Sequence, residues 1–282
     1  MKQPLAYIHP EAKIAPNVVI EPFVTIDKNV IIKEGTRISS GVTILEGARI
    51  GKNCTIFPGA VIAAIPQDLK FNGEDTVVEI GDNTTIRECV TINRGTSAKG
   101  KTVVGSNCLL MAYVHVAHDC ATGNNVILGN ACQIAGEVKI DDWAIVSGGT
   151  LIHQFCHVGS HVIVQGGSRI GKDIPPFITA GRDPISYAGV NSIGLRRRGF
   201  TNEQICDIQN IYRLLFLSGL NTSQAIERIE QNYLPQKKKT KLYSFFVTHK
   251  EALLKDILIN KNLKRSDTKI TPLFKYSSTY GS

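Results

Sequence analysis

Aliphatic residues recur at every sixth position from Ile14 to Ile170, in three runs that keep the same phase. A period of six fits neither an α-helix, which repeats every ~3.6 residues, nor the alternation of a simple strand. It is typical of a parallel β-helix, in which three short strands make one triangular coil and each hexapeptide forms one side. Only Thr122 departs from this aliphatic series, whose members are Ile14, Ile20, Ile26, Ile32, Ile38, Ile44, Ile50, Ile56, Ile62, Ile80, Ile86, Ile92, Val104, Leu110, Val116, Leu128, Ile134, Ile140, Val146, Ile152, Val158, Val164 and Ile170.

The position four residues after each aliphatic is restricted to small or β-branched residues, such as Val18, Thr36 and Ala48. We predict that this slot also turns inward. Five of the seven cysteines occupy it, and we interpret them as small buried residues without a chemical role: Cys54, Cys108, Cys120, Cys132 and Cys156. Only Cys89 and Cys206 fall outside the slot.

Two interruptions, at residues 63–79 and 97–103, are predicted to be loops, and loops that leave a rigid scaffold often carry function. The repeat is expected to end after Lys172, because Pro175 and Pro176 cannot donate ladder hydrogen bonds. Residues 173–199 are then predicted to be an irregular connector. The fold class is therefore mainly β: a parallel β-helix within residues 1–190, followed by a small α-helical domain of residues 191–259.

The helical domain is predicted from caps and periodicity. Thr201 to Gln204 form a capping box before a helix whose apolar face comprises Ile205, Ile208, Ile211, Leu214 and Leu215. Gly219 should end this helix, a second should run from Thr222 or Ser223 to about Gln231, and a third from about Leu242 to Ile259. Residues 260–282 are polar, and we expect them to be disordered.

Composition narrows the cellular setting. The N-terminus has no apolar signal core, and no apolar run is long enough to span a bilayer. With the cysteines in core slots, we expect a cytoplasmic protein without disulfides or a membrane span. The net charge of +8 gathers in two clusters: Arg196, Arg197 and Arg198, and Lys237, Lys238, Lys239 and Lys241. Such clusters suit nucleic acid, anionic lipid, a phosphorylated small molecule or an acidic protein. No nucleic-acid motif accompanies them, and a solvated surface explains the lysines equally well.

Two histidines and an aspartate, His115, His118 and Asp119, fall on one coil. Residues 18 apart should stack one strand spacing apart, which places His118, Gly136 and Gln154 in one column. A histidine below an accessible glycine N–H suits acyl transfer, with the imidazole as general base and the N–H as oxyanion donor.

Metal binding is the alternative use of the histidines. His153, His157 and His161 lie close in sequence but occupy different slots of the repeat, so we do not expect one chain to gather them around a metal. We expect this run to lie mostly at the surface. A metal site shared between subunits stays open.

Several separated motifs make the chain resemble the UDP-N-acetylglucosamine O-acyltransferase family over about residues 6–258, and any one alone would be weak. They are Pro66–Lys70, Ile86–Glu88 with Val90–Ile92, Asn93–Thr96, His115–Cys120, His153–Cys156 and Gly194–Phe200. The resemblance implies a left-handed β-helix, against the usual crossover rule, and a homotrimer with active sites between subunits. It also implies transfer of a 3-hydroxyacyl chain from acyl carrier protein to the 3-hydroxyl of UDP-N-acetylglucosamine, in lipid A biosynthesis, without a metal or cofactor.

The resemblance also implies residue roles. His118 would be the base, Asp119 would orient the imidazole, and the Gly136 N–H would bind the oxyanion. Gly166 would form the floor of the acyl groove, where glycine suits a long chain. Further positions match substrate contacts: Asp68, Lys70, His115, His153, Gln154, Arg197 and Arg198. Because the His118 column holds no Ser or Cys, we expect direct attack without an acyl-enzyme.

Three positions depart from some members of the family. Asn93 and Glu137 stand where some members carry histidine, and Ile193 stands where some carry an acidic residue. They affect expected substrate contacts and leave the base unchanged. Three rival functions remain. The related N-acyltransferase should carry an extra N-terminal domain, a carbonic anhydrase would need metal, and a binding solenoid leaves His115, Asp119 and the Pro66–Lys70 motif unexplained.

Overall fold

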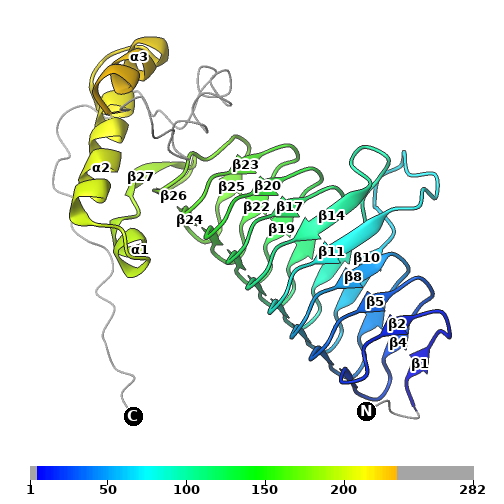
Figure 1. Ribbon diagram of the computed structural model, residues 1–282. Helices are drawn as coiled ribbons and strands as arrows, with labels where there is room; N and C mark the ends of the chain where they lie inside the picture. The colour runs from blue at the N-terminus through cyan, green and yellow to red at the C-terminus, as the bar shows by residue number, and fades with distance from the viewer. Residues whose placement is uncertain (1–4, 234–282) are drawn as a thin grey trace, which may run out of the picture.

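The computed structural model describes residues 5–233, and its main body is a left-handed parallel β-helix with three sheets as the sides of a prism (Figure 1). Sheet A contains β1 (Tyr7–Ile8), β4 (Thr25–Ile26), β7 (Thr43–Ile44), β10 (Val61–Ala64), β13 (Thr91–Asn93), β16 (His115–Val116), β19 (Gln133–Ile134), β22 (Leu151–Ile152) and β25 (Arg169–Ile170). Sheet B contains β2 (Lys13–Ile14), β5 (Ile31–Ile32), β8 (Ala48–Ile50), β11 (Val77–Ile80), β14 (Lys101–Val104), β17 (Ala121–Thr122), β20 (Lys139–Ile140) and β23 (His157–Val158). Sheet C contains β3 (Val19–Ile20), β6 (Arg37–Ile38), β9 (Thr55–Ile56), β12 (Thr85–Ile86), β15 (Leu109–Leu110), β18 (Ile127–Leu128), β21 (Ile145–Val146), β24 (Ile163–Val164), β26 (Ile178–Gly181) and β27 (Ser186–Val190).

The predicted coil of 18 residues is confirmed by the register of the strands. In sheet A, His115 pairs with Gln133, and Gln133 pairs in parallel with Leu151. Every aliphatic slot from Ile20 to Ile170 is buried, as is Thr122, so each hexapeptide adds one core side chain. Burial of one such side chain stabilises the fold by about 1.5–3 kcal/mol.

The predicted inward slot is also confirmed. Its five cysteines are buried free thiols, whereas Cys89 and Cys206 are exposed. Burial raises the pKa of the Cys120 thiol to about 12 and that of Cys156 to about 11. These thiols therefore stay protonated and behave as core residues.

The first loop is shorter than predicted, and the second begins and ends three residues earlier than predicted. The first spans residues 65–76, because β10 extends to Ala64 and β11 already begins at Val77. The second spans residues 94–100, because Lys101 starts β14 and pairs with Val77 of the preceding coil. The longer strands at these two coils provide extra ladder hydrogen bonds where the chain leaves the prism.

The expected end of the repeat after Lys172 was wrong. Strand β26 pairs in parallel with β24, and β27 returns antiparallel to β26, so the coil continues past the prolines. Pro175 and Pro176 fall on the corner before β26, where no ladder donor is required. The irregular connector predicted for residues 173–199 is replaced by this hairpin and by a short helix, α1 (Ser192–Arg197), capped by Asn191.

Two longer helices follow at the C-terminal end of the prism (Figure 1). Helix α2 (Asn202–Leu217) begins at the predicted capping box, in which the Thr201 hydroxyl accepts from the Gln204 N–H at 3.2 Å. Helix α3 (Thr222–Tyr233) starts where expected. The predicted third helix, the lysine cluster and the tail of residues 260–282 lie outside the described residues. None of α1, α2 and α3 combines the length and hydrophobicity that a bilayer crossing requires.

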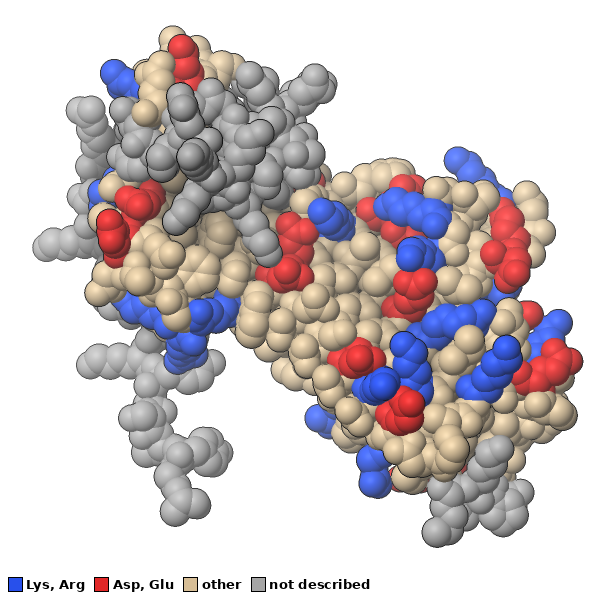
Figure 2. Space-filling view, in the orientation of Figure 1, with Lys and Arg blue, Asp and Glu red and all other residues tan. Residues whose placement is uncertain are grey.

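The outward faces of the sheets differ in chemistry. Acidic and basic side chains are interspersed over sheet B (Figure 2), including Lys13, Arg49, Glu79 and Lys139. Sheet C instead presents a half-buried aliphatic stripe formed by Leu109, Ile127, Ile145 and Ile163. Charged residues favour water, so the uncharged stripe marks a face suited to contact with protein.

Candidate active site

His118 lies at the corner between β16 and β17, directly beneath Gly136. The Glu137 N–H donates to the His118 carbonyl at 3.0 Å, which locks the two coils in register. A Cβ atom added to Gly136 would lie 2.6 Å from both Cε1 and Nε2 of the imidazole. The Phe155 N–H donates to the Gly136 carbonyl at 3.2 Å, so Gln154 occupies the next level. The predicted column is therefore confirmed.

The Asp119 carboxylate contacts Nδ1 of the His118 ring. The imidazole Nδ1 lies 2.8 Å from Asp119 Oδ2, and the carboxylate is fully buried while the imidazole is 20% exposed. Burial raises the pKa of Asp119, but hydrogen bonds from Thr96 and His118 outweigh it and hold the pKa below its usual range. The ionised carboxylate can only accept, so Nδ1 carries the proton and Nε2 keeps its lone pair for a substrate.

His115 lies on the outer face of sheet A and lines a pocket of about 300 Å³ with Gln67, Cys89, Thr91, Tyr113 and Gln133. Its Nδ1 lies 2.7 Å from Thr91 Oγ1. Burial lowers the pKa of His115, and the nearby His118 lowers it further, so the ring is neutral at pH 7. Because Gln67 of the first loop lines this pocket, the loop lies next to the coil that carries His115 and His118.

Asp68 and Lys70 follow Gln67 in this loop, where the Lys70 N–H donates to Asp68 Oδ1 at 3.0 Å. The Lys70 side chain is exposed. Asn93 fastens the start of the loop, because its Nδ2 donates to the Ile65 carbonyl at 2.5 Å. The departure at Asn93 therefore has a structural role in placing the loop. Sequence reasoning missed Gln67, whose proximity to His115 depends on the path of the loop. It also missed Cys89, Tyr113 and Gln133, although Gln133 lies 18 residues after His115 and pairs with it in sheet A.

The remaining predicted residues lie at three places. His153 and Gln154 are exposed at the corner of His118. Gly166 lies between β24 and β25, at the opposite edge of sheet A, where an added Cβ would be 3.1 Å from the Gly148 carbonyl oxygen. Arg197 and Arg198 lie at the end of α1, and the structure does not bring them together with His118 in one chain.

Arg198 is held at the corner between sheets B and C. Its guanidinium carbon lies 5.2 Å from the Trp143 ring centroid, and its Nη1 lies 3.3 Å from His161 Nδ1. A guanidinium only donates, so Nδ1 of His161 is the acceptor. Burial lowers the pKa of Arg198. An arginine side chain stays charged in proteins. Arg197, by contrast, is exposed.

The expectation that His157 and His161 lie at the surface was wrong. His157 is 7% exposed and its Nε2 lies 2.9 Å from Asp141 Oδ2. His161 is 8% exposed and stacks between the rings of Trp143 and Phe177. Both are covered by the chain after β25, which the hexapeptide pattern does not describe.

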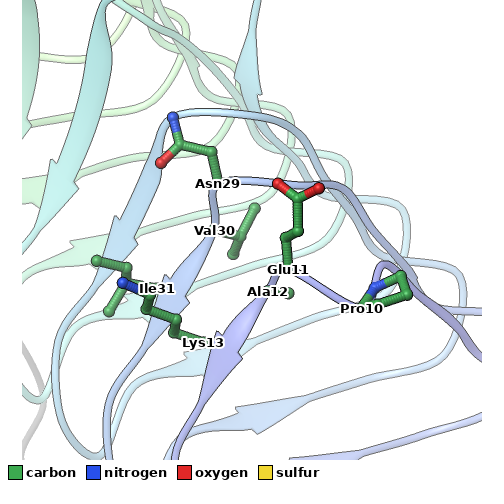
Figure 3. Close-up of a pocket in the computed structure, with 7 residues that line it drawn as sticks. All are labelled: Pro10, Glu11, Ala12, Lys13, Asn29, Val30 and Ile31. Atoms are coloured by element: carbon green, nitrogen blue, oxygen red, sulfur yellow. The ribbon is translucent and has the colours of Figure 1, made fainter.

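Among residues 5–233, no group of three or more His, Cys, Asp or Glu side chains is placed to hold a metal ion. A hollow of about 560 Å³ between β2 and β5 is lined by Pro10–Lys13 and Asn29–Ile31 (Figure 3). It contains none of the predicted site residues.

Glu137, another departure, lies one residue beyond Gly136. Lys99 Nζ lies 3.6 Å from Glu137 Oε2 and donates to the Asp119 carbonyl at 3.3 Å. The lysine thus balances the charge of a carboxylate that lies next to Gly136. Ile193 is exposed on α1.

Comparisons with known proteins agree with this geometry. Residues 173–254 match the family model described as UDP-N-acetylglucosamine O-acyltransferase, domain 2, and residues 2–106 match that of the GMPPB C-terminal domain. An acyl-[acyl-carrier-protein]–UDP-N-acetylglucosamine O-acyltransferase of Janthinobacterium sp. is 48% identical over 165 residues, which cover 58% of this chain and 63% of that relative, less than two thirds of its length.

Solved structures extend the match. The UDP-N-acetylglucosamine acyltransferase of Bacteroides fragilis is 58% identical, with a TM-score of 0.85 over 88% of this chain and 97% of that one. The enzyme of Francisella novicida is 43% identical, with a TM-score of 0.80 over 82% and 85% of the two chains. The chain belongs to the UDP-N-acetylglucosamine O-acyltransferase family.

Proposed function

We propose that this protein transfers a 3-hydroxyacyl chain from acyl carrier protein to the 3-hydroxyl of UDP-N-acetylglucosamine, the first step of lipid A biosynthesis. The names of its relatives support the two substrates. The observation that carries the proposal is the His118–Asp119 pair beneath the backbone of Gly136. An assay of purified protein with UDP-N-acetylglucosamine and 3-hydroxyacyl carrier protein tests it, and absence of O-acylated product would overturn it.

The chemistry follows from the two ring nitrogens of His118. Nε2 removes the proton of the sugar hydroxyl while its oxygen attacks the thioester carbonyl, and Asp119 steadies the imidazolium that forms. The carbonyl oxygen becomes an oxyanion, which the Gly136 N–H stabilises. That N–H donates to no hydrogen bond within residues 5–233. Collapse of the intermediate then breaks the carbon–sulfur bond, and the imidazolium returns its proton to the leaving thiolate.

Direct attack is favoured over an acyl-enzyme. The nearest candidate nucleophile in sequence, Cys120, points into the core, and burial raises its pKa to about 12. A protonated buried thiol is a poor nucleophile. The sugar hydroxyl, activated by His118, therefore attacks the thioester in one transfer.

A homotrimer with sites between subunits is the assembly that we propose. The aliphatic stripe on sheet C would face a neighbour, while charged sheet B would face water. His118 and Arg198 lie at different corners of one chain, so a cleft between two chains can combine them. Light scattering and size exclusion of the full chain test the trimer; a monomer would contradict it.

In this arrangement Asp68, Lys70, His115, His153 and Gln154 would contact the sugar and the acyl donor around His118. Arg197 and Arg198 would bind the diphosphate or the acidic carrier protein, because a guanidinium pairs with phosphate bidentately. Elemental analysis of the purified protein decides between this reading and a metal site shared between subunits. The buried free thiols favour the cytoplasm as its location.

Replacing Arg198 by alanine should raise the KM for UDP-N-acetylglucosamine or for the carrier protein by roughly 10-fold or more. The expectation rests on the loss of charge-assisted hydrogen bonds, each of about 1.5–3 kcal/mol. Steady-state kinetics with each substrate varied in turn measures the effect. Arg213→Ala, which removes an exposed arginine of α2, is the control. Unchanged KM values for both substrates would assign Arg198 a packing role on Trp143 instead.

Replacing Gly166 by methionine should shift preference toward shorter acyl chains. Gly166 would form the floor of the acyl groove, where a methionine side chain would fill space that the acyl chain would otherwise occupy. An added Cβ would lie 3.1 Å from the Gly148 carbonyl oxygen, a close but not prohibitive contact. The ratio of kcat/KM values over a panel of 3-hydroxyacyl carrier proteins measures this, with Gly166→Ala as a smaller step. An unaltered ratio in the methionine variant would place the chain terminus elsewhere.

A further inference from the structure

The loop of residues 94–100 brings Thr96 against Asp119, which lies 23 positions later in the sequence. Thr96 is 6% exposed and Asp119 is 1% exposed, so the contact is shielded from water. In a regular prism no residue would occupy this place, because each corner turns directly into the next strand. The interruption of the repeat therefore supplies a group that the hexapeptide pattern cannot.

Both hydrogen-bond donors of Thr96, its main-chain N–H and its side-chain hydroxyl, contact the Asp119 carboxylate. Its N–H lies 3.0 Å from Asp119 Oδ1 and 3.2 Å from Oδ2, and its Oγ1 lies 2.7 Å from Oδ2. Oδ2 is also the oxygen bound by His118 Nδ1 at 2.8 Å. The Ala98 N–H donates to Thr96 Oγ1 at 3.2 Å, so the hydroxyl proton is left to point at the carboxylate.

The backbone of Asp119 is held in the same way by a side chain. At a neighbouring regular corner, the Glu137 N–H donates to a main-chain carbonyl, that of His118. At Asp119 the N–H donates instead to Thr102 Oγ1 at 2.8 Å. Thr96 within the loop and Thr102 in the strand that follows it thus hold the carboxylate and the backbone N–H of Asp119.

We propose that Thr96 is a positioning residue of the transferase, the third member of a Thr96–Asp119–His118 relay. It acts through Asp119 and contacts no substrate. The inference rests on the proposed function, because it assigns the relay to the base that activates the sugar hydroxyl. With its N–H and its hydroxyl as donors, Thr96 keeps the carboxylate ionised and aimed at Nδ1, which selects the tautomer of the neutral ring that has its lone pair on Nε2.

Thr96→Val tests the role, because it keeps the shape of the side chain and removes the hydroxyl. We expect kcat to fall about 10- to 100-fold with little change in KM. Loss of the donor makes Asp119 more basic and strengthens its hold on the imidazolium. The acid limb of the kcat/KM profile should therefore move to higher pH. Thr96→Ser, which retains both donors, should restore kcat and the profile.

Thr84→Val is the matched control for a merely structural role. Thr84 is a fully buried threonine whose hydroxyl donates to the Gly105 carbonyl at 2.8 Å, away from the relay. The Thr84→Val variant should be less stable than the wild-type protein. Its kcat per folded protein and the pH profile of its kcat/KM should be unchanged. If Thr96→Val behaves in the same way as Thr84→Val, the proposal is overturned.

An NMR readout separates this inference from the proposed function. The Nδ1–H proton of His118, identified by its loss in His118→Ala, should be shifted downfield by Asp119 in the wild-type protein and should move in Thr96→Val. This change requires no substrate. If the protein does not acylate UDP-N-acetylglucosamine but the His118 resonance moves in Thr96→Val, then the proposed function is wrong and the relay stands. If the His118 Nδ1–H resonance is the same in Thr96→Val as in the wild-type protein, then the relay is wrong for any substrate.

Discussion

Replacing His118 by alanine should lower kcat by about 10²- to 10⁴-fold, the usual contribution of a general base. In the proposed mechanism Nε2 of this imidazole takes the proton of the sugar hydroxyl, because Nδ1 is bound to Asp119 at 2.8 Å. The measurement is product formation under saturating substrates, with KM determined separately. Because the base acts in the transition state, KM should change far less than kcat.

The fold should survive this substitution. The His118 side chain is 20% exposed, and Asp119 keeps its hydrogen bonds from Thr96 after the ring is removed. Melting temperature and oligomeric state should therefore stay close to wild type. His9→Ala, which removes a histidine from the first coil, serves as the control. Turnover of His118→Ala within tenfold of wild type would reassign the base.

The interior of the prism was predictable from the sequence because one rule generates it. Each hexapeptide places an aliphatic and a small residue inward, so counting in steps of 18 correctly stacked His118, Gly136 and Gln154. The same counting assigned the five core cysteines. A local repeat carries this information in full, since every coil contacts only its neighbours.

The surroundings of the column were not predictable in this way. Thr96 reaches Asp119 only through the path of a loop, and Gln67 reaches His115 through another. Burial of His157 and His161 depends on a segment that returns over the prism after β25. Such contacts join residues whose sequence separation obeys no period, and only a structure locates them.

The position of Arg198 was also not predictable from the repeat. Sequence resemblance placed Arg198 in the site, whereas in one chain it lies at the corner of Trp143 and His161. Trp143 and His161 belong to a different corner of the triangular cross-section from His118, and α1, which lies outside the repeat, places Arg198 on that corner. The proposed cleft between subunits would reconcile the two placements, and for this reason assembly and activity are proposed together.

Replacing Gly136 by alanine should lower kcat on the order of 10²-fold, because the new methyl group occupies the place of the imidazole. An added Cβ would lie 2.6 Å from Cε1 and Nε2 of His118 and 3.3 Å from Nδ1, well inside contact distance. The ring must move away, and a displacement of about 1 Å at a reacting group is enough for this loss. Overpacking should also reduce stability by about 1–3 kcal/mol. Product formation and thermal unfolding measure the two effects.

Two companion variants identify the cause. Gly171→Ala adds the same methyl group where nothing lies within 4 Å, so it should leave kcat and stability unchanged. In the double variant His118→Ala with Gly136→Ala, the clash is absent, and stability should recover although activity does not. The stability changes of the two substitutions would then not be additive, which is expected only if His118 and Gly136 are in contact. If Gly136→Ala keeps kcat within twofold of wild type, or if its loss of stability persists in the double variant, then His118 does not lie beneath the glycine in solution and the acyl-transfer geometry fails with it.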